Sequence, residues 1–146
     1  MVDVTTSTTI ERPQEEVAAY AADPSHAPEW YANIGSVVWE TTPPVAVGSR
    51  MAFVARFLGR TLAYTYEVVE LVPGERLVMR TAQGPFPMET TYTWTADGPT
   101  ATVMTLRNRG EPRGFSKLVA PFMGAAISRA NRKDLRRLKA RFEARP

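Results

Sequence analysis

Residues 64–80 read YTYEVVELVPGERLVMR, and this stretch decides the fold. Two runs that alternate apolar and polar side chains flank Pro73-Gly74, a dipeptide typical of turns, so the stretch predicts a β-hairpin. Paired positions in a hairpin have a nearly constant sum of residue numbers, about 147 for this turn. That register puts Glu67 opposite Arg80, and an opposite-charge pair across two strands supports it.

Strands and turns continue on both sides of this hairpin. Further turns are marked by Gly48, Gly59, Gly84-Pro85 and Asp97-Gly98. The strand-like runs between the turns cover residues 34–42, 49–58, 61–72, 76–82, 87–95 and 100–109. Their short connections predict an antiparallel meander, with one longer loop at Pro43-Pro44. A seventh strand is predicted at residues 2–10, where Val, Thr and Ile alternate with polar residues.

The turns at Gly84-Pro85 and Asp97-Gly98 extend the register across further strands. They place Arg80 beside Glu89, and Glu89 beside Arg107, so that charges of opposite sign alternate across the sheet. Exposed pairs of this kind contribute roughly 0.2–1 kcal/mol each. A solvated charge ladder is therefore favoured over a catalytic role for these carboxylates.

Alternation assigns the strand residues to two faces of the sheet. One face is bulky, apolar and free of charge, with Met51, Phe53, Phe57, Tyr64, Tyr66, Val68, Leu77, Met79, Met88, Tyr92, Trp94, Met104 and Leu106. The other face carries the charged residues. This pattern is typical of an antiparallel sheet with one buried and one solvated face.

Two short helices are predicted between the first strand and the meander. Pro13 is followed by two glutamates, as is common in a first helical turn, and Val17 and Tyr20 give that helix an apolar edge. A second short helix over residues 24–31 should bring Trp30 toward the interior.

A long C-terminal helix is predicted from a change of period. Leu135, Leu138 and Phe142 recur every three to four residues, and the opposite side is basic, with Arg129, Arg132, Lys133, Arg136 and Arg137. The earlier part of this segment is apolar nearly all round and holds Phe115, Leu118, Val119, Phe122, Met123, Ala126 and Ile127. Pro121 and Gly124 predict a kink or a late helix start between the two parts.

The chain has 146 residues, of which 44% are hydrophobic and 23% charged, as in ordinary globular proteins. These values exclude a disordered, collagen-like or coiled-coil protein, and the length predicts one domain over residues 1–146. The lack of cysteine excludes disulfides and thiolate metal sites. No apolar run reaches the ~18 residues of a membrane span, and the N-terminus does not resemble a signal peptide, so we expect a soluble, cytoplasmic protein.

The net charge of +3 is unevenly distributed. Residues 113–146 carry ten lysines and arginines against two acids, whereas the rest of the chain is acidic. A solvated outer helix face is the favoured interpretation. Weak attraction to an anionic membrane or an acidic partner through Arg132, Arg136 and Arg137 comes second. Nucleic-acid binding is least favoured, because the basic stretch has no recognised motif and no interleaved aromatic residues.

Residues able to support catalysis or metal binding are scarce. His26 is the only histidine and there is no cysteine, so the sequence predicts no metal site, and we expect no cofactor. The sequence also lacks a G-x-S-x-G motif and phosphate-binding glycine loops, which argues against hydrolase chemistry and nucleotide binding. A surface position or a helix start is a better interpretation of His26 than a catalytic base.

Short motifs along nearly the whole chain carry a family resemblance. They are Thr9-Ile10-Glu11-Arg12-Pro13 with Val17, Asp23 followed by Pro28-Glu29-Trp30, Val47-Gly48-Ser49-Arg50, Glu67 to Pro73 leading to Arg76-Leu77, Thr91-Tyr92-Thr93-Trp94 before Asp97-Gly98, and a closing helix from Leu118 to Leu138. In this order and spacing they resemble the START-like superfamily, also called SRPBCC or Bet v 1-like. Within it the chain resembles the polyketide cyclase/dehydratase-type group.

This resemblance implies an α+β helix-grip fold. In that fold a curved, seven-stranded antiparallel sheet with two short helices wraps around a long C-terminal helix and encloses a cavity. The superfamily includes lipid carriers, cyclases and hormone receptors, so the fold alone does not give the function. A concave, mostly apolar cavity is the usual form of a small-molecule site.

The predicted ligand-binding residues lie on the inward face of the sheet, the second short helix and the early part of the last helix. They are Trp30, Phe53, Tyr64, Tyr66, Met79, Tyr92, Trp94, Met104, Phe115 and Phe122. Phe122 is expected to be largely buried and to contact at least one of Tyr64, Tyr66, Tyr92 or Trp94. Methionines in the wall would let it adapt to a ligand.

Three hypotheses follow for the function. The first is binding of a small hydrophobic ligand, such as a lipid, an isoprenoid or an aromatic polyketide, without catalysis, because the inward residues carry no charge. The second is a polyketide cyclase or dehydratase that uses the hydroxyls of Tyr64, Tyr66 and Tyr92 as hydrogen-bond donors. The third is an interaction module that acts through the basic helix. The ligand, the occurrence of a reaction and the choice between monomer and homodimer stay open.

Overall fold

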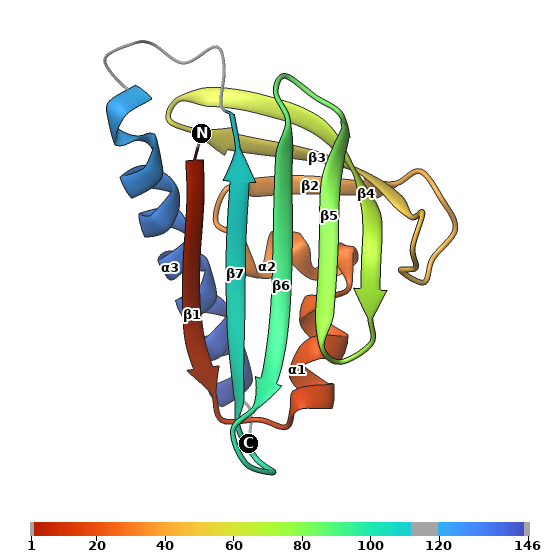
Figure 1. Cartoon of the computed structure of the whole chain (residues 1–146), viewed down its shortest axis with the longest axis vertical. Helices are drawn as coiled ribbons and strands as arrows, with labels where there is room; N and C mark the ends of the chain where they lie inside the picture. Colours follow the sequence, from red (N-terminus) through yellow and green to blue (C-terminus); the bar gives the residue numbers. More distant parts are fainter. Residues whose placement is uncertain (1, 112–119, 145–146) are drawn as a thin grey trace.

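The computed structural model describes residues 2–111 and 120–144. Within them, seven strands form one antiparallel sheet in the order β1-β7-β6-β5-β4-β3-β2 (Figure 1). The strands are β1 (Val2–Ile10), β2 (Ile34–Trp39), β3 (Arg50–Phe57), β4 (Arg60–Val72), β5 (Arg76–Gln83), β6 (Met88–Ala96) and β7 (Thr102–Gly110). The helical elements are α1 (Gln14–Ala21), η1 (Pro24–His26), α2 (Ala27–Trp30), η2 (Ala120–Phe122) and α3 (Met123–Glu143).

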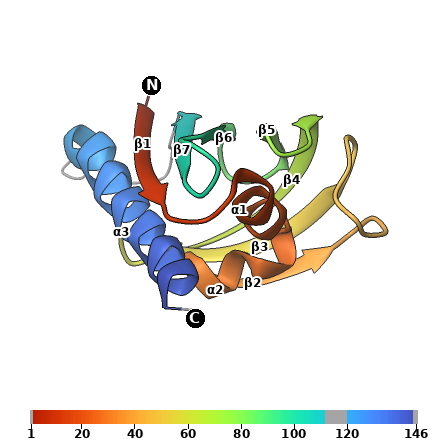
Figure 2. The same ribbon diagram turned by 90° about the horizontal axis from the view of Figure 1, so that it is seen from below.

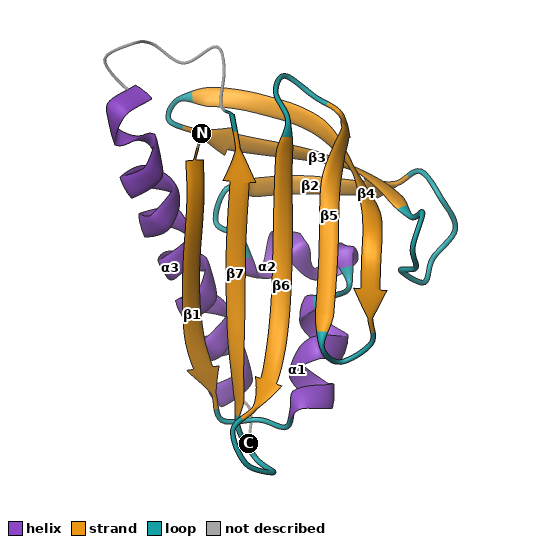
Figure 3. Cartoon of the chain, in the orientation of Figure 1, coloured by secondary structure: helices purple, strands orange, loops and turns teal. Residues whose placement is uncertain are grey.

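The sheet is curved, and all three α-helices lie on its concave side (Figures 2 and 3). Register shifts interrupt the pairing of β4 with β5 at Thr65/Tyr66 and at Val68/Glu70. Such bulges bend a strand and increase its twist, which lets the long β4 turn from one end of the sheet to the other. At the far edge, α3 packs along β1 and reaches α2. This arrangement confirms the predicted α+β helix-grip fold.

Two of the three predicted charge pairs are in register and the third is wrong. Glu67 pairs with Arg80, and Arg80 pairs with Glu89 with 2.6 Å between Nε and Oε2. Glu89 then faces Arg109 instead of Arg107, because Ala96 pairs with Thr102 across a loop of residues 97–101, and the sum of paired residue numbers is 198 instead of about 196. Pro99 explains the longer loop, since proline has no N–H to offer to a strand partner.

The long helix starts late, at Met123, as Pro121 and Gly124 led us to expect. Its C-terminal half buries Leu135, Leu138 and Phe142 and exposes the basic side. Among the described residues, no helix is long and apolar enough to cross a membrane.

The prediction that Phe122 is buried is wrong. Its side chain is 68% exposed, whereas Met123 beside it is 4% exposed. Phe122 belongs to the short η2 turn and precedes the first residue of α3, so the helical periodicity used to place it does not extend to its position. Phe115, Leu118 and Val119, the other large residues expected on this stripe, lie outside the described residues.

The solid core fills one end of the space between the sheet and the helices. Here the lower ends of the strands, α1, α2 and the C-terminal half of α3 meet. The largest fully buried side chains of this packing include Trp30, Ile10, Met104, Leu106, Leu135, Leu138 and Val17. We call this region the closed half of the interior, because large buried side chains from the strands and the helices gather in it.

Candidate functional site

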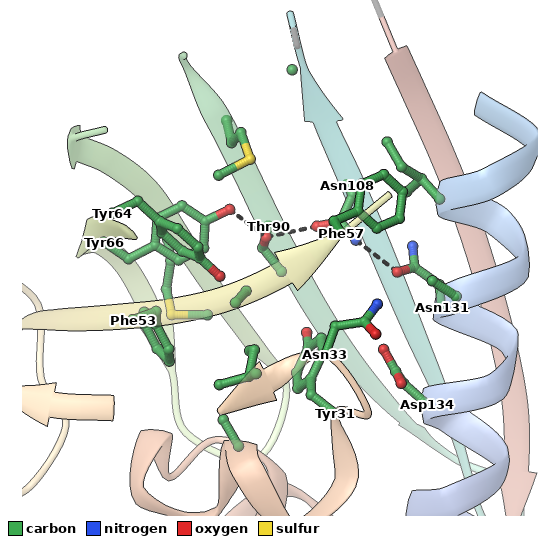
Figure 4. A pocket seen from close by; sticks show the side chains of 18 of the residues that line it. Tyr31, Asn33, Phe53, Phe57, Tyr64, Tyr66, Thr90, Asn108, Asn131 and Asp134 are labelled. Carbon is green, nitrogen blue, oxygen red and sulfur yellow. Dashed lines mark hydrogen bonds between the residues drawn. The ribbon is translucent and has the colours of Figure 1, made fainter. Parts of the chain in front are cut away.

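The other end of the interior holds a cavity of about 170 Å³ between the concave face of the sheet and the N-terminal half of α3 (Figure 4). We call this region the open half. The sheet contributes mostly apolar side chains, including Phe53, Ala55, Leu62, Leu77, Met79 and Met88. The helix contributes Met123, Ile127, Ala130, Asn131 and Asp134. An apolar cavity of roughly 150 Å³ accepts a benzene-sized molecule, so this cavity has room for one ring with short substituents.

Five of the ten predicted site residues line this cavity. They are Phe53, Tyr64, Tyr66, Met79 and Tyr92. Inward positions of the paired strands β3 and β4 bring the first three rings together: the centroids of Phe53 and Tyr64 are 5.5 Å apart, and those of Tyr64 and Tyr66 are 5.0 Å apart. The period-two pattern of the strands therefore located the sheet side of the cavity wall.

The other predicted site residues are elsewhere. Trp30, Trp94 and Met104 are buried to within 2% of complete burial, but they belong to the closed half and do not line the cavity. Their strand or helix positions are buried as expected, and they belong to the same cluster as residues of α1 and of the C-terminal half of α3. Phe122 is exposed, and Phe115 lies outside the described residues.

A chain of polar side chains crosses one wall of the cavity. Tyr66 and Thr90 are joined by a 2.8 Å hydrogen bond, and the Thr90 hydroxyl donates to Oδ1 of Asn108 at 2.7 Å. Nδ2 of Asn108 then donates to Oδ1 of Asn131 on α3 at 3.0 Å. This chain links β4, β6, β7 and the helix, and it holds Asn131 at the cavity surface (Figure 4).

Asp134 is a buried carboxylate in the cavity wall, and it corrects the expectation that the cavity wall carries no charge. Its side chain is 3% exposed, and its Oδ1 accepts a hydrogen bond from the backbone N–H of Ala32 at 2.9 Å. Burial raises the pKa of this carboxyl to about 6, and the hydrogen bond from Ala32 and the charges of Arg137 and Lys133 only partly oppose the shift.

A sequence signal for this stripe existed. Ile127, Asn131 and Asp134 follow one another at spacings of four and three, so they share one face of α3. Our interpretation used only apolar residues to set the orientation of the helix, and it therefore ended the inward face where the residues became polar. Asn108 and Tyr31 were missed for similar reasons, the first as a polar strand residue and the second as the neighbour of Trp30.

The tyrosine hydroxyls at the cavity serve as neutral hydrogen-bonding groups. Tyr31 and Tyr92 share a 2.6 Å hydrogen bond between their hydroxyls. Burial raises the pKa of Tyr31, Tyr64 and Tyr92 well above the usual range and raises that of Tyr66 to about 12. These groups are therefore protonated near neutral pH, and they can form hydrogen bonds there without titrating.

His26 lies outside the cavity wall. Its Nδ1 is 2.9 Å from the carbonyl oxygen of Tyr20, which can only accept, so the ring donates from Nδ1. The ring also stacks on Tyr20, with centroids 4.2 Å apart. These contacts join α1 to the start of α2. In the described part of the chain, no three His, Cys, Asp or Glu side chains gather in a way that could hold a metal ion.

The basic side of α3 faces away from the cavity. Arg132 and Arg136 are exposed, and Nη2 of Arg137 is 3.4 Å from the carbonyl oxygen of Glu29. Contact of this face with an anionic membrane or an acidic partner stays a prediction.

Several solved structures have an architecture similar to that of this chain. A START superfamily protein from Mycobacterium smegmatis is 14% identical over 97% of both chains, with a TM-score of 0.80. A protein from Thermus thermophilus is 21% identical over 97% of both chains, with a TM-score of 0.78. The Zhui aromatase/cyclase from a Streptomyces species is 14% identical over 98% of this chain and 94% of its own, with a TM-score of 0.81.

These likenesses confirm the fold that the sequence motifs suggested. No curated protein sequence matches the chain. Residues 1–143, nearly the whole chain, match the family described as polyketide cyclase / dehydrase and lipid transport. The seven-stranded sheet, the long last helix and the cavity between them agree with this match, and the chain belongs to that family.

Proposed function

We propose that the protein binds a compact hydrophobic molecule in the cavity of the open half. The observation that carries this proposal is the unfilled space itself. Protein interiors are close-packed, and the closed half of the same interior follows that rule. A space of about 170 Å³ with an apolar floor and a few polar groups at one end has the usual character of a small-molecule site.

The shape of the cavity narrows the ligand class. Phe53, Tyr64 and Tyr66 line the space as a group of neighbouring rings, which favours an aromatic or other flat ring over a flexible chain. The volume suits one ring with short substituents, so among the lipid, isoprenoid and aromatic classes expected from the sequence we favour a small aromatic compound. Met79 and Met88 give the wall some freedom to adapt.

Binding is tested with ethylbenzene, using chemical shifts of the ¹⁵N-labelled protein. The matched variants are Ala55→Leu, which fills the cavity, and Ala63→Leu, which places the same side chain on the exposed face of the neighbouring strand. We expect shifts that saturate in the wild type and in Ala63→Leu and that disappear in Ala55→Leu. Equal responses in all three proteins, or no response in the wild type, would show that the cavity does not take such a ligand.

A second candidate function, acid–base catalysis on a bound carbonyl compound, is favoured by Asp134. A carboxyl with a pKa of about 6 inside a cavity can accept and return a proton near neutral pH. Tyrosines with raised pKa values are poor proton donors, so in this version Asp134 moves the proton and the tyrosine hydroxyls remain hydrogen-bonding groups. Asp134 would remove a proton from the carbon next to a ligand carbonyl and leave an enolate. Water would then protonate that carbon, and the hydroxide left behind would take the proton from Asp134.

Exchange of the methyl protons of acetophenone in D₂O tests this second function. A catalyst of enolisation exchanges them faster than buffer, and Asp134→Asn, which keeps the shape of the side chain but cannot take the proton, should return the rate to that of buffer. Equal rates with the wild type, the variant and buffer would leave binding as the function of the cavity.

A further inference from the structure

The hydrogen-bond chain in the cavity wall ends in an unused donor. The Thr90 hydroxyl donates its one proton to Asn108, so the hydroxyl of Tyr66 must be the donor in its bond with Thr90. Asn108 in turn donates to Asn131, so each group in the chain donates to the next one toward the helix. The last group in the chain is Nδ2 of Asn131, a residue that is 4% exposed. This nitrogen is buried and has no hydrogen-bond partner among the described residues. A buried N–H without an acceptor is costly, so this one is suited to an acceptor that arrives from outside.

Asp134, one helical turn further on, has an acceptor oxygen without a donor in the described part of the chain. Among the described residues, the backbone N–H of Ala32 is the only hydrogen-bond donor to its carboxylate, and it bonds to Oδ1. Oδ2 is left as an acceptor at the cavity surface. Residues three apart on a helix have neighbouring side chains, about 5–6 Å apart at Cβ. Asn131 and Asp134 therefore present a donor and an acceptor side by side at the helix wall (Figure 4).

We propose that Asn131 and Asp134 form a paired subsite for the uncharged polar end of the ligand, in which an acceptor oxygen meets Asn131 and a hydroxyl meets Asp134. This inference rests on the proposed binding function and specifies its ligand: a compact ring with a carbonyl and a hydroxyl close together. The hydrophobic part of the ligand would point toward Phe53 and the tyrosine rings on the sheet side.

The same pair disfavours an anionic ligand. The groups around the Asp134 carboxylate are Tyr31 and Tyr92, which are neutral, Asn33, and the cations Lys133 and Arg137 on its own helix. Those two cations lie on the solvent side of the helix and are screened by water, whereas a second carboxylate beside Asp134 would be buried with it. A carboxylic acid should therefore bind worse than an alcohol of the same shape once Asp134 is ionised.

Five probes of similar shape separate these contributions. They are 2-hydroxy-1-phenylethanone, acetophenone, 2-phenylethanol, ethylbenzene and phenylacetate, titrated into the full chain by calorimetry at pH 7.5. We expect the hydroxyketone to bind about tenfold tighter than acetophenone or 2-phenylethanol, as one further buried hydrogen bond allows. Both of these should bind tighter than ethylbenzene. Phenylacetate should bind about tenfold more weakly than 2-phenylethanol.

Two variants assign the preference to the pair. Asn131→Leu should make acetophenone no better than ethylbenzene while 2-phenylethanol keeps its advantage. Asp134→Asn keeps an acceptor for Ala32 but turns the ligand-facing oxygen into a donor, so phenylacetate should gain about tenfold over its wild-type affinity. Ile127→Val, on the same wall, is the control, and it should shift all five affinities in the same direction because it changes only shape.

The outcomes distinguish the paired subsite from the proposed binding of a hydrophobic molecule in the cavity. Equal binding of all five probes by the wild type, or tightest binding of phenylacetate, would overturn the paired subsite and leave hydrophobic binding intact. Binding of none of them, ethylbenzene included, would overturn both. If Asn131→Leu fails to fold by circular dichroism, Asn131→Ala removes the same amide with less bulk and carries the test.

Discussion

The closed and open halves of the interior are built from the same strands and the same helix, but they pack differently. In the closed half, the inward residues Trp94 of β6 and Met104 of β7 belong to the same buried cluster as Leu138 and Phe142 of α3. In the open half, the strands present equally bulky residues, and α3 contributes the small or polar residues Ala130, Asn131 and Asp134 beside Met123 and Ile127. The side chains of the helix, more than those of the sheet, decide where the interior is open.

Unpaired polar groups occur in both halves of the described structure, and their surroundings differ. Nε1 of Trp30 and Nε1 of Trp94 are buried without a partner in the closed half, and neither residue lines the cavity. Nδ2 of Asn131 is also unpaired but borders the cavity. The first two cost stability and gain nothing from a ligand, whereas the third becomes satisfied when an acceptor enters.

The largest expected effect is the loss of stability when a leucine is truncated, and it should differ between the two halves. Leu138→Ala removes a fully buried side chain from the closed half and should lower the free energy of unfolding by about 2–5 kcal/mol, with ligand affinity unchanged. Leu62→Ala deletes the same atoms from the cavity wall, where packing is already incomplete. It should cost at least about 1 kcal/mol less and should alter the affinity for ethylbenzene. Urea unfolding of both variants measures the difference, and equal costs would mean that the open half is as tightly packed as the closed half.

The second effect is the pH dependence that Asp134 creates. Its pKa rises from 3.8 in the unfolded chain to about 6 in the folded protein, so the folded state binds more protons between these values. The stability associated with this group is therefore present below about pH 4, falls as the pH rises toward 6 and is absent above it. Asp134→Asn keeps the hydrogen bond from Ala32 and avoids the buried charge. It should be about 2–3 kcal/mol more stable than the wild type at pH 7.5 and similar to it at pH 4.

Unfolding of the wild type and Asp134→Asn across pH 4 to 8 measures this difference directly. Glu143→Gln is a suitable control on the same helix, because its carboxyl is exposed and its pKa is lowered chiefly by the hydrogen bond from Lys139, so its effect on stability has the opposite sign. A difference between the wild type and Asp134→Asn that does not change with pH would mean that Asp134 is well solvated in the folded protein.

The sheet was predictable from the sequence to a greater extent than the site. Alternation placed Phe53, Tyr64, Tyr66, Met79 and Tyr92 on the inward face, and all five line the cavity. Period-two patterns depend on local sterics and burial, which a single strand records completely. Turn length is recorded less well, and the extra residues around Pro99 moved the partner of Glu89 by two positions.

The polar end of the cavity could not be inferred in the same way. Asn131 and Asp134 occur in a segment with many charged residues, where their helical spacing from Ile127 is the one local sign that they face inward. The contact that holds Asp134 there comes from Ala32, about a hundred residues earlier in the chain, which offers its N–H at that point of α3. Such a contact can be inferred only when the long-range packing of α2 against α3 is known.

A smaller effect tests the hydrogen-bond chain in the cavity wall. Tyr66→Phe removes the hydroxyl that bonds to Thr90 and should lower the free energy of unfolding by about 0.5–1.5 kcal/mol. Tyr64→Phe is the matched control, because the neighbouring ring keeps its stacking on Phe53 and, within the described residues, its hydroxyl has no hydrogen-bond partner. Its change should be within about 0.5 kcal/mol. Similar costs for both would mean that the chain contributes nothing measurable.

The smallest effect is expected at Phe122, the residue whose burial was wrongly predicted. With 68% of the side chain exposed, Phe122→Ala removes little buried surface, and the free energy of unfolding should change by less than about 0.5 kcal/mol. Met123→Ala at the next position removes a side chain that is 4% exposed and lines the cavity, so it should cost clearly more and should change the affinity for ethylbenzene. The contrast tests where the inward face of α3 begins, because a helix that started one turn earlier would give Phe122 the larger cost. A loss of several kcal/mol in Phe122→Ala would therefore place this ring inside the open half and would enlarge the wall that the ligand meets.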